Sequence, residues 1–297
     1  MQRGSVLVLT LLIISIEAGP YVNSTYTRLA FNKVGKAGGS TLTSILGHLA
    51  RNNGLTIVRP KRFNPSADEL ATALKVLQSG HVYSNHAGHL RMNVSNLAWI
   101  NIVREPIDRE QSLYYYFIDP LARKAHKANA SLVARQRDTR CGCAGLEFDQ
   151  CVRLRHTRGC VLGCTSGQMR AFCEPKSACS FAEAMVMLED YVFVGLMEEY
   201  ELTIHIIEVL LPQFFSGASA YYKNMGLHRP KRGVSANPVT HTSGLGAVSR
   251  TSREILLNTP SCAQEAKFYT LAKRRFWLTA AHVLGESLVE VASNSLK

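Results

Sequence analysis

A short apolar segment that leads through a glycine-rich loop into an amphipathic helix constrains the fold of this chain more than any other feature. Residues 27–34 (TRLAFNKV) have the composition of a buried strand, and the loop GKAGGST begins directly after them. Apolar side chains then recur at helical spacing at Leu42, Ile45, Leu46 and Leu49. Glycines let successive backbone N–H groups point at one anion, and the start of a helix adds partial positive charge. The segment therefore predicts an anion site at one end of a strand.

The chain beyond this segment alternates between strand and helix patterns. The apolar run at 98–103 (AWINIV) is typical of a strand that is covered on both faces, and Pro106 is well placed to begin a helix. Further strands are predicted at 55–58, 82–83 and 191–195, and further helices at 67–77, 181–188, 198–211 and within 252–290. The alternation indicates an α/β fold with a central parallel sheet flanked by helices. We expect a single domain over residues 25–290.

Two segments interrupt the alternation. Residues 118–180 are basic and hold seven of the eight cysteines, so we expect a disulfide-rich insertion there. The spacing around Cys141-Gly142-Cys143 does not match the paired C-x-x-C knuckles of zinc sites, and no metal is predicted. Residues 223–248 are basic and rich in Gly, Pro and Ser, which predicts a long flexible loop.

The N-terminal segment predicts entry into the secretory pathway. Arg3 precedes an apolar run of eleven residues from Val6 to Ile16, which is too short for a comfortable membrane span of ~20 residues. Residues 1–20 are therefore expected to be a signal peptide or a short signal-anchor. The cysteine cluster fits an oxidising compartment, and the sequons at Asn23, Asn93 and Asn129 are candidate glycosylation sites.

The charge balance indicates a polyanionic partner. Lys and Arg number 34 against 22 Asp and Glu, which leaves a net charge of +12. Such a surface suits nucleic acid, phospholipid or a sulfated polysaccharide. Few nucleic-acid partners exist in the secretory pathway, so no nucleic-acid partner is expected. A merely soluble basic protein stays an alternative.

The glycine-rich loop is not a Walker A motif. In that motif the lysine follows the second glycine and is followed at once by Ser or Thr, whereas Lys36 precedes Gly38 and Gly39 here. We also find no convincing carboxylate for a magnesium ion, which disfavours a P-loop kinase. When the loop is considered alone, a plain glycine-rich turn with an exposed lysine remains an alternative interpretation.

A second candidate half-site follows the strand at 98–103. Arg104 ends that strand, where open α/β sheets bind ligands, and Ser112 lies about two helical turns further on. The two side chains could hold a second phosphate, with the guanidinium as a bidentate donor. The alternative is that Arg104 forms a helix-capping salt bridge with Glu105 or Asp108.

Read together, these segments resemble known signatures. A loop with Lys36 and Ser40-Thr41, followed by a strand and Arg-x-Pro-x-x-Arg-x-x-Ser, resembles the two donor-binding signatures of the sulfotransferases that use 3′-phosphoadenylyl sulfate (PAPS). More specifically, the chain resembles the uronosyl 2-O-sulfotransferases, which act on heparan sulfate or dermatan/chondroitin sulfate. The segments that carry this resemblance are FNKVGK at 31–36, INIVREP at 100–106, VGLMEE at 194–199 and LPQFFSGA at 211–218.

Three positions depart from the family pattern. Lys33 stands where the family has Arg, and Glu105 stands where it usually has Asp, so both keep their charge. Ser84 replaces one of two histidines that members often carry, which leaves His86.

The resemblance implies a P-loop-like sulfotransferase fold and a donor site for PAPS, with PAP as the product. His86 would be the catalytic base, with His89 as the alternative, and Lys36 would stabilise the leaving phosphate. The residues implied in donor binding are Lys36, Ala37, Gly38, Gly39, Ser40 and Thr41 for the 5′-phosphosulfate, Arg104 and Ser112 for the 3′-phosphate, and Arg229 and Lys231 in a flap over the nucleotide.

The acceptor would be a sulfated glycosaminoglycan held by basic side chains. The candidates are Lys33, Arg109, Arg170 and Arg229, followed by Lys61 and Arg62. The family pattern further suggests the disulfides Cys151–Cys160 and Cys173–Cys179, and leaves Cys141, Cys143, Cys164 and Cys262 unassigned.

The resemblance also implies a place in the Golgi lumen, with a type II membrane anchor, or secretion if the leader is cleaved. A homotrimer is implied by family analogy alone. A catalytically inactive glycosaminoglycan-binding relative and, less favoured, a P-loop kinase remain the competing functions.

Overall fold

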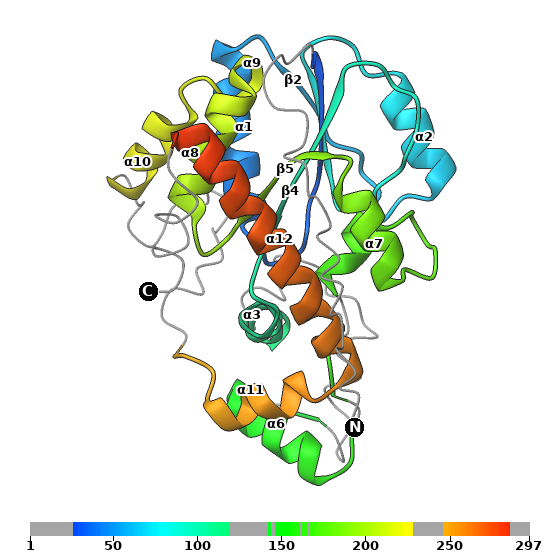
Figure 1. The fold of residues 1–297 in the computed structure, drawn as a ribbon, viewed down its shortest axis with the longest axis vertical. Coiled ribbons are helices and arrows are strands. Elements are labelled where there is room, and N and C mark those ends of the chain that lie inside the picture. Colours follow the sequence, from blue (N-terminus) through cyan, green and yellow to red (C-terminus); the bar gives the residue numbers. More distant parts are fainter. Residues whose placement is uncertain are drawn as a thin grey trace, which may run out of the picture.

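The computed structural model describes residues 26–118, 142–143, 146–160, 162–164, 167–227 and 246–285. Its centre is a sheet of five parallel strands in the order β2-β3-β1-β4-β5 (Figure 1). The strands are β1 (Arg28–Asn32), β2 (Thr56–Val58), β3 (His81–Asn85), β4 (Leu97–Val103) and β5 (Tyr191–Leu196). The predicted α/β fold with a central parallel sheet is confirmed.

Helices cover both faces of this sheet. In Figure 1, α1 and α8–α10 lie on one side, α2 and α7 lie on the other, and α12 crosses in front. The bounds are α1 (Gly39–Asn52), α2 (Ala67–Lys75), α3 (Pro106–Ile118), α7 (Phe181–Leu188), α8 (Tyr200–Leu210), α9 (Pro212–Phe215), α10 (Ala218–Leu227) and α12 (Pro260–Leu284). The remaining elements are α6 (Phe148–Thr157), the 3₁₀ helix η1 (Gln168–Phe172) and α11 (Arg250–Leu257).

The main core lies between the sheet and these helices. Strand β4 is buried along nearly its whole length, as its continuous apolar run predicts for a central strand of a parallel sheet. Helix α1 buries the apolar stripe seen in the sequence, at Leu42, Ile45, Leu46 and Leu49. The core therefore fixes the position of β1 and β4, from whose carboxyl ends the loops with Lys36 and Arg104 begin.

A smaller second core forms below the sheet. It joins α3, α6 and α11 through buried side chains that include Ile107, Phe148, Val152 and Leu256 (Figure 1). Helix α6 lies in the segment for which no regular structure was predicted. It begins with a capping box in which Glu147 and Gln150 each bond the other's backbone N–H.

One predicted disulfide is confirmed and one is wrong. Cys173 is bonded to Cys179 as expected, but Cys151 is bonded to Cys143 and not to Cys160. Cys151 lies in the first turn of α6 and Cys160 lies beyond the helix end at Thr157, which is about 9 Å further along the axis at 1.5 Å per residue. Bonded cysteines have Cα atoms about 4.4–6.8 Å apart, so the helix keeps these two sulfurs apart. Cys160 is itself disulfide-bonded.

A third disulfide spans the chain. Cys164 is bonded to Cys262, 98 residues later in the first turn of α12. It ties the cysteine-rich segment to the C-terminal helices. Both cysteines were left unassigned by the sequence.

The ends of the predicted segments need one correction. Helix α10 continues to Leu227, so residues 223–227 of the expected basic loop are helical because they continue the turns begun at Ala218. The expected leader at 1–20 and most of the loop lie outside the described residues. Within the described ranges no single helix is both long and apolar enough to cross a membrane. The segments Tyr200–Leu210 and Pro212–Met225 reach that composition only when joined across a 119° bend.

Candidate active site

Three of the residues singled out by the sequence follow three neighbouring strands. Lys36 lies in the loop after β1, His86 directly follows β3, and Arg104 directly follows β4. Strands β3, β1 and β4 are adjacent and parallel, so their carboxyl ends meet at the same edge of the sheet. This edge is where open α/β sheets bind ligands.

The loop between β1 and α1 adopts the conformation of an anion cradle. Lys36 has φ 66° and Gly38 has φ 78°, both in the left-handed region, which is strained for a lysine. No side chain caps the N-terminus of α1, and its first turn holds no acidic residue. The first turn thus presents partial positive charge at the loop, which favours an anion.

Tyr200 on α8 supports this loop from below. Its hydroxyl donates to the Gly38 carbonyl at 2.9 Å. A Cβ on Gly38 would come within 2.4 Å of the Tyr200 ring, so only glycine fits between this ring and the loop. Of the remaining loop residues predicted to bind the donor, Ala37 and Gly39 are buried, Thr41 is half-buried and Ser40 is exposed.

The Lys36 ammonium is held in a partly buried position. Its Nζ lies over the ring of Tyr116 on α3, 4.5 Å from the ring centre. Burial, with a further contribution from the charge of Arg104, lowers the pKa of Lys36 to about 8. The side chain therefore still carries its charge at neutral pH.

His86 is fixed by the same loop. Its Nδ1 lies 2.9 Å from the Lys33 carbonyl, and because a carbonyl only accepts, Nδ1 must carry the proton. Burial and the charge of Lys33 lower the pKa of His86 to about 4. The ring is neutral at pH 7, and its Nε2 carries the lone pair of a general base.

The alternative base, His89, lies in the interior. Its side chain is 1% exposed and its ring packs against Trp99 and Tyr191. A sugar hydroxyl cannot reach that position without opening the core.

The second half-site gathers at the start of α3. The side chain of Gln168 bonds both the N–H and the C=O of Arg104, which orients the end of β4. The Arg104 guanidinium donates to the Lys36 carbonyl at 3.4 Å, so the two half-sites touch. Ser112 is 1% exposed, and its Oγ has no hydrogen-bond partner among the residues that the structure describes. An unpartnered buried hydroxyl is a candidate contact for a ligand oxygen, which can reach it only when the side chains that cover Ser112 move.

The expected acceptor contacts are distributed differently. Lys33 is half-buried beside His86, and Arg170 is exposed on η1. Arg109, in contrast, is 2% exposed, pairs with Glu110 at 2.5 Å and donates to the Gly35 carbonyl at 3.4 Å. It therefore lies inside the protein, behind the loop, because α3 turns that face toward the core.

Four other expected positions lie outside the residues that the structure describes. Arg229, Lys231, Asn23 and Asn129 are not among the described residues, whereas Asn93 is exposed. In the described part of the chain, no three His, Cys, Asp or Glu side chains lie together in a way that could hold a metal ion.

The structure places an aromatic ring, that of Phe63, beside His86, and the sequence did not single out this residue. Phe63 is 69% exposed, yet its ring stacks on His86 with 5.5 Å between ring centres. The backbone of this loop is tied to the end of β3, since Asn64 donates to the His86 carbonyl and Asn85 donates to the Arg62 carbonyl. An exposed aromatic inside the basic run RPKRFNP was the available signal.

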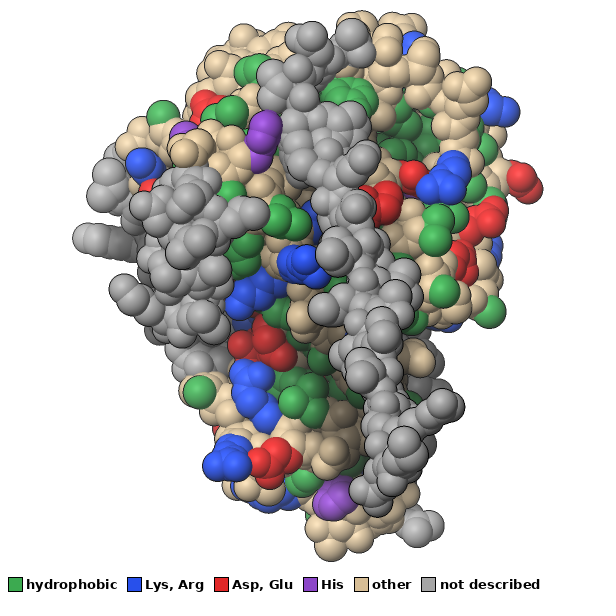
Figure 2. Space-filling model, in the orientation of Figure 1, with side chains coloured by type: hydrophobic (Ala, Val, Ile, Leu, Met, Phe, Trp, Pro, Cys, Tyr) green, Lys and Arg blue, Asp and Glu red, His purple; other side chains and the backbone are tan. Residues whose placement is uncertain are grey.

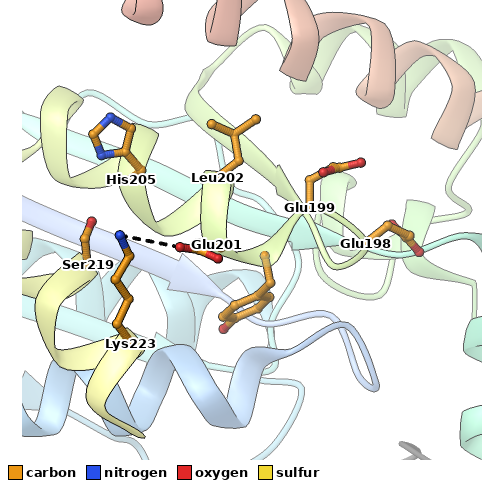
Figure 3. Close-up of a pocket in the computed structure, with 8 residues that line it drawn as sticks. Glu198, Glu199, Glu201, Leu202, His205, Ser219 and Lys223 are labelled. Atoms are coloured by element: carbon orange, nitrogen blue, oxygen red, sulfur yellow. Dashed lines mark ion pairs between the residues drawn. The ribbon is translucent and has the colours of Figure 1, made fainter. Parts of the chain in front are cut away.

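A concavity of about 500 Å³ lies beside the loop between β1 and α1, but its lining is acidic, unlike that of the candidate anion site (Figure 3). Glu198, Glu199 and Glu201 line it, and Lys223 on α10 points across it to Glu201. Its acidic lining does not suit a phosphate donor. Tyr200 connects the two places, because its ring lines the concavity while its hydroxyl holds Gly38.

On the face shown in Figure 2, Lys and Arg side chains extend from the middle of the molecule toward its lower left, with acidic side chains between them.

The sequence of this chain is similar to those of several known proteins. No family model matches the chain. The uronyl 2-sulfotransferase homolog pip of Drosophila melanogaster is 27% identical over 282 residues, which covers 84% of this chain and 52% of that protein. The uronyl 2-sulfotransferase of Homo sapiens is 23% identical, over 67% of this chain and 52% of that protein. The chain thus spans about half the length of these two relatives.

The heparan sulfate 2-O-sulfotransferase hst-2 of Caenorhabditis elegans is 25% identical, over 76% of this chain and 74% of that protein. These three matches cover between 67% and 84% of the chain. By its α/β fold and by these similarities, the chain is a distant homologue of the uronyl 2-sulfotransferases and the heparan sulfate 2-O-sulfotransferases.

Proposed function

We propose that this protein transfers a sulfuryl group from PAPS to the 2-hydroxyl of a uronic acid in a glycosaminoglycan, either heparan sulfate or dermatan/chondroitin sulfate. The observation that carries the proposal is the position of Lys36, His86 and Arg104 after three neighbouring parallel strands. Similarity to 2-O-sulfotransferases supports the class of reaction.

The described residues fit the two phosphate-bearing ends of the donor. The left-handed loop at Lys36 and Gly38 and the uncapped start of α1 suit the 5′-phosphosulfate. Arg104 and the unpartnered Oγ of Ser112 suit the 3′-phosphate. The hydrogen bond from the Arg104 guanidinium to the Lys36 carbonyl supports the proposal that the two half-sites form one donor site. The flap residues Arg229 and Lys231 remain a prediction.

The chemistry follows from the two central side chains. Nε2 of His86 removes the proton of the acceptor hydroxyl while the hydroxyl oxygen forms a bond to sulfur. The bond between sulfur and the 5′-phosphate oxygen breaks in line with this attack, and negative charge accumulates on the departing phosphate. The ammonium of Lys36 stabilises that charge, which is greater in the transition state than in the bound donor.

The acceptor side is proposed to lie along the loop at 59–64, next to His86. Lys33 and Arg59 lie close enough for their charges to interact, and Lys61 and Arg62 follow on the same loop. Phe63 offers a ring face to a sugar beside the proposed base. Arg170 is the other exposed candidate.

The cellular setting is proposed on separate grounds. The three disulfides among the described residues suggest a secretory-pathway location. A place in the Golgi lumen, an N-terminal anchor, glycosylation at Asn93 and assembly into a trimer are further proposals. Expression with the native N-terminus, followed by membrane fractionation, glycosidase treatment and light scattering, tests them one by one; a soluble, unmodified monomer would contradict them.

An incorporation assay tests the enzyme directly. Purified protein, labelled PAPS and a panel of heparan, dermatan and chondroitin acceptors should show label transfer to at least one polymer. The variants Lys36→Ala and His86→Ala should each lower turnover by roughly 10²–10⁴-fold. The exposed Lys267→Ala on α12 serves as a control and should transfer label at the wild-type rate.

Each outcome of the assay has a distinct meaning. Binding of PAP without incorporation into any acceptor would identify a non-catalytic relative. Wild-type turnover in either alanine variant would refute the role assigned to that residue.

A further inference from the structure

Three carboxylates surround the start of α3, where the proposed 3′-phosphate site lies. Glu105, Asp108 and Glu198 are all close enough to act electrostatically on the Arg104 guanidinium. Left to themselves they would pair with Arg104 and would also repel an incoming phosphate. The sequence raised this same alternative for Arg104.

The structure pairs these carboxylates with other groups. Arg253 on α11 donates from Nη1 to Glu105 Oε2 at 3.0 Å and from Nη2 to Asp108 Oδ1. Glu198 accepts from the Glu105 backbone N–H at 2.7 Å and from the Tyr269 hydroxyl at 2.9 Å. The side chain of Arg253 is 32% exposed, so these ion pairs are partly shielded from water.

We propose that Arg253 is a positioning residue for the donor: by pairing with Glu105 and Asp108 it keeps the Arg104 guanidinium available to the 3′-phosphate and reduces the negative charge that this phosphate meets. The proposal rests on the proposed function, because it assumes that a nucleotide 3′-phosphate binds at Arg104 and Ser112. It concerns an arginine almost 150 residues from Arg104 in the chain, which no motif in the sequence connects to the site.

The competing explanation is that the ion pairs only fasten α11 to α3. The two explanations differ in what the carboxylates do once Arg253 is gone. If the ion pairs only fasten α11 to α3, removing Arg253 and removing the two carboxylates should weaken PAP binding to the same extent. If Arg253 instead balances the charge of Glu105 and Asp108, its removal should weaken PAP binding only when both carboxylates are still present.

Calorimetric titration with PAP separates these explanations. We expect Arg253→Ala to weaken PAP binding by roughly tenfold. The double variant Glu105→Gln/Asp108→Asn, which breaks the same ion pairs, should bind PAP at least as tightly as the wild type. The triple variant should recover most of the loss. Arg253→Lys should bind PAP more tightly than Arg253→Ala.

The matched control is Arg250→Ala. Arg250 lies one turn before Arg253 on α11, and it is 92% exposed and pairs with Glu254 on the same helix. Its removal subtracts the same charge but should leave PAP affinity unchanged.

The results can overturn the proposal in two ways. A double carboxylate variant that loses as much affinity as Arg253→Ala would show a fastening role, and equal affinities for Arg253→Ala and Arg250→Ala would show no role. A folded wild-type protein that does not bind PAP at all would instead refute the proposed function, before Arg253 is tested.

Discussion

The hydrogen bond between His86 and the Lys33 carbonyl decides which nitrogen of the proposed base can act. The carbonyl accepts the Nδ1 proton, so Nε2 is left with its lone pair. Burial lowers the pKa of this ring to about 4, from an ordinary value of about 6.5. The pKa of Lys36 is lowered as well, to about 8. Between about pH 4 and about pH 8, therefore, His86 is neutral and Lys36 is charged.

The pH dependence of kcat/KM for PAPS should show both shifts. His86 is neutral above about pH 4 and Lys36 is charged below about pH 8, so kcat/KM should stay level from pH 5 to 7 and fall as the pH rises through 8. Initial rates at low PAPS concentration measure this. An acid limb near pH 6.5 would contradict the burial of His86.

The fold must be checked over the same range. His86 and His89 both have a folded pKa of about 4, below their unfolded value, so the stability they contribute is present above pH 6.5 and is lost as the pH falls toward 4. Circular dichroism at each pH separates unfolding from loss of the base.

At the scale of single elements, the loop between β1 and α1 depends on a close fit with α8. Gly38 has φ 78° and lies against Tyr200 and Met197. Gly35 lies in the same loop, but a Cβ there would meet nothing within 4 Å. Alanine variants of these two glycines therefore separate the effect of a steric clash from the effect of replacing a glycine in this loop.

Gly38→Ala should destabilise the protein by about 1–3 kcal/mol and weaken PAP binding, because the new methyl group displaces the loop or the tyrosine. Gly35→Ala should leave the free energy of unfolding nearly unchanged. Denaturant titration and PAP calorimetry measure the two effects. Equal stability of the two variants would mean that the loop moves freely away from Tyr200.

The loop that carries Phe63 allows a test of the acceptor side. Phe63→Ala should raise the acceptor KM by roughly tenfold and leave PAP affinity unchanged, because the ring stacks on His86, the proposed base for the acceptor hydroxyl. Val76, which is also exposed but lies at the end of α2, provides the control as Val76→Ala. A change in PAP affinity with no change in acceptor KM would place Phe63 on the donor side.

At the scale of the whole molecule, the disulfide between Cys164 and Cys262 joins the second core to the long helix α12. It closes a far longer stretch of chain than the bond between Cys173 and Cys179, which are six residues apart. The longer closure removes more conformational freedom from the unfolded chain.

Replacing Cys164 and Cys262 by serine should cost about 5 kcal/mol of stability, against about 2 kcal/mol for the pair Cys173 and Cys179. Thermal or denaturant unfolding of the two double variants compares them. The reverse order would show that local contacts, and not chain closure, dominate the effect of these bonds.

The sequence by itself determined the strands of the sheet and the main helices between them, the glycine-rich loop and the motif at Arg104, because these depend on local periodicity and on residues close together in the chain. It did not predict α6, α9 or α10. Only the tertiary structure decided what depends on contacts across the chain. It showed that Arg109 is buried, that Cys151 pairs with Cys143, and that the carboxylates at α3 pair with Arg253. It also placed Lys36, His86 and Arg104 at one edge of the sheet. The strand order β3-β1-β4 cannot be read from a linear pattern, because residues on adjacent strands can lie far apart in the chain.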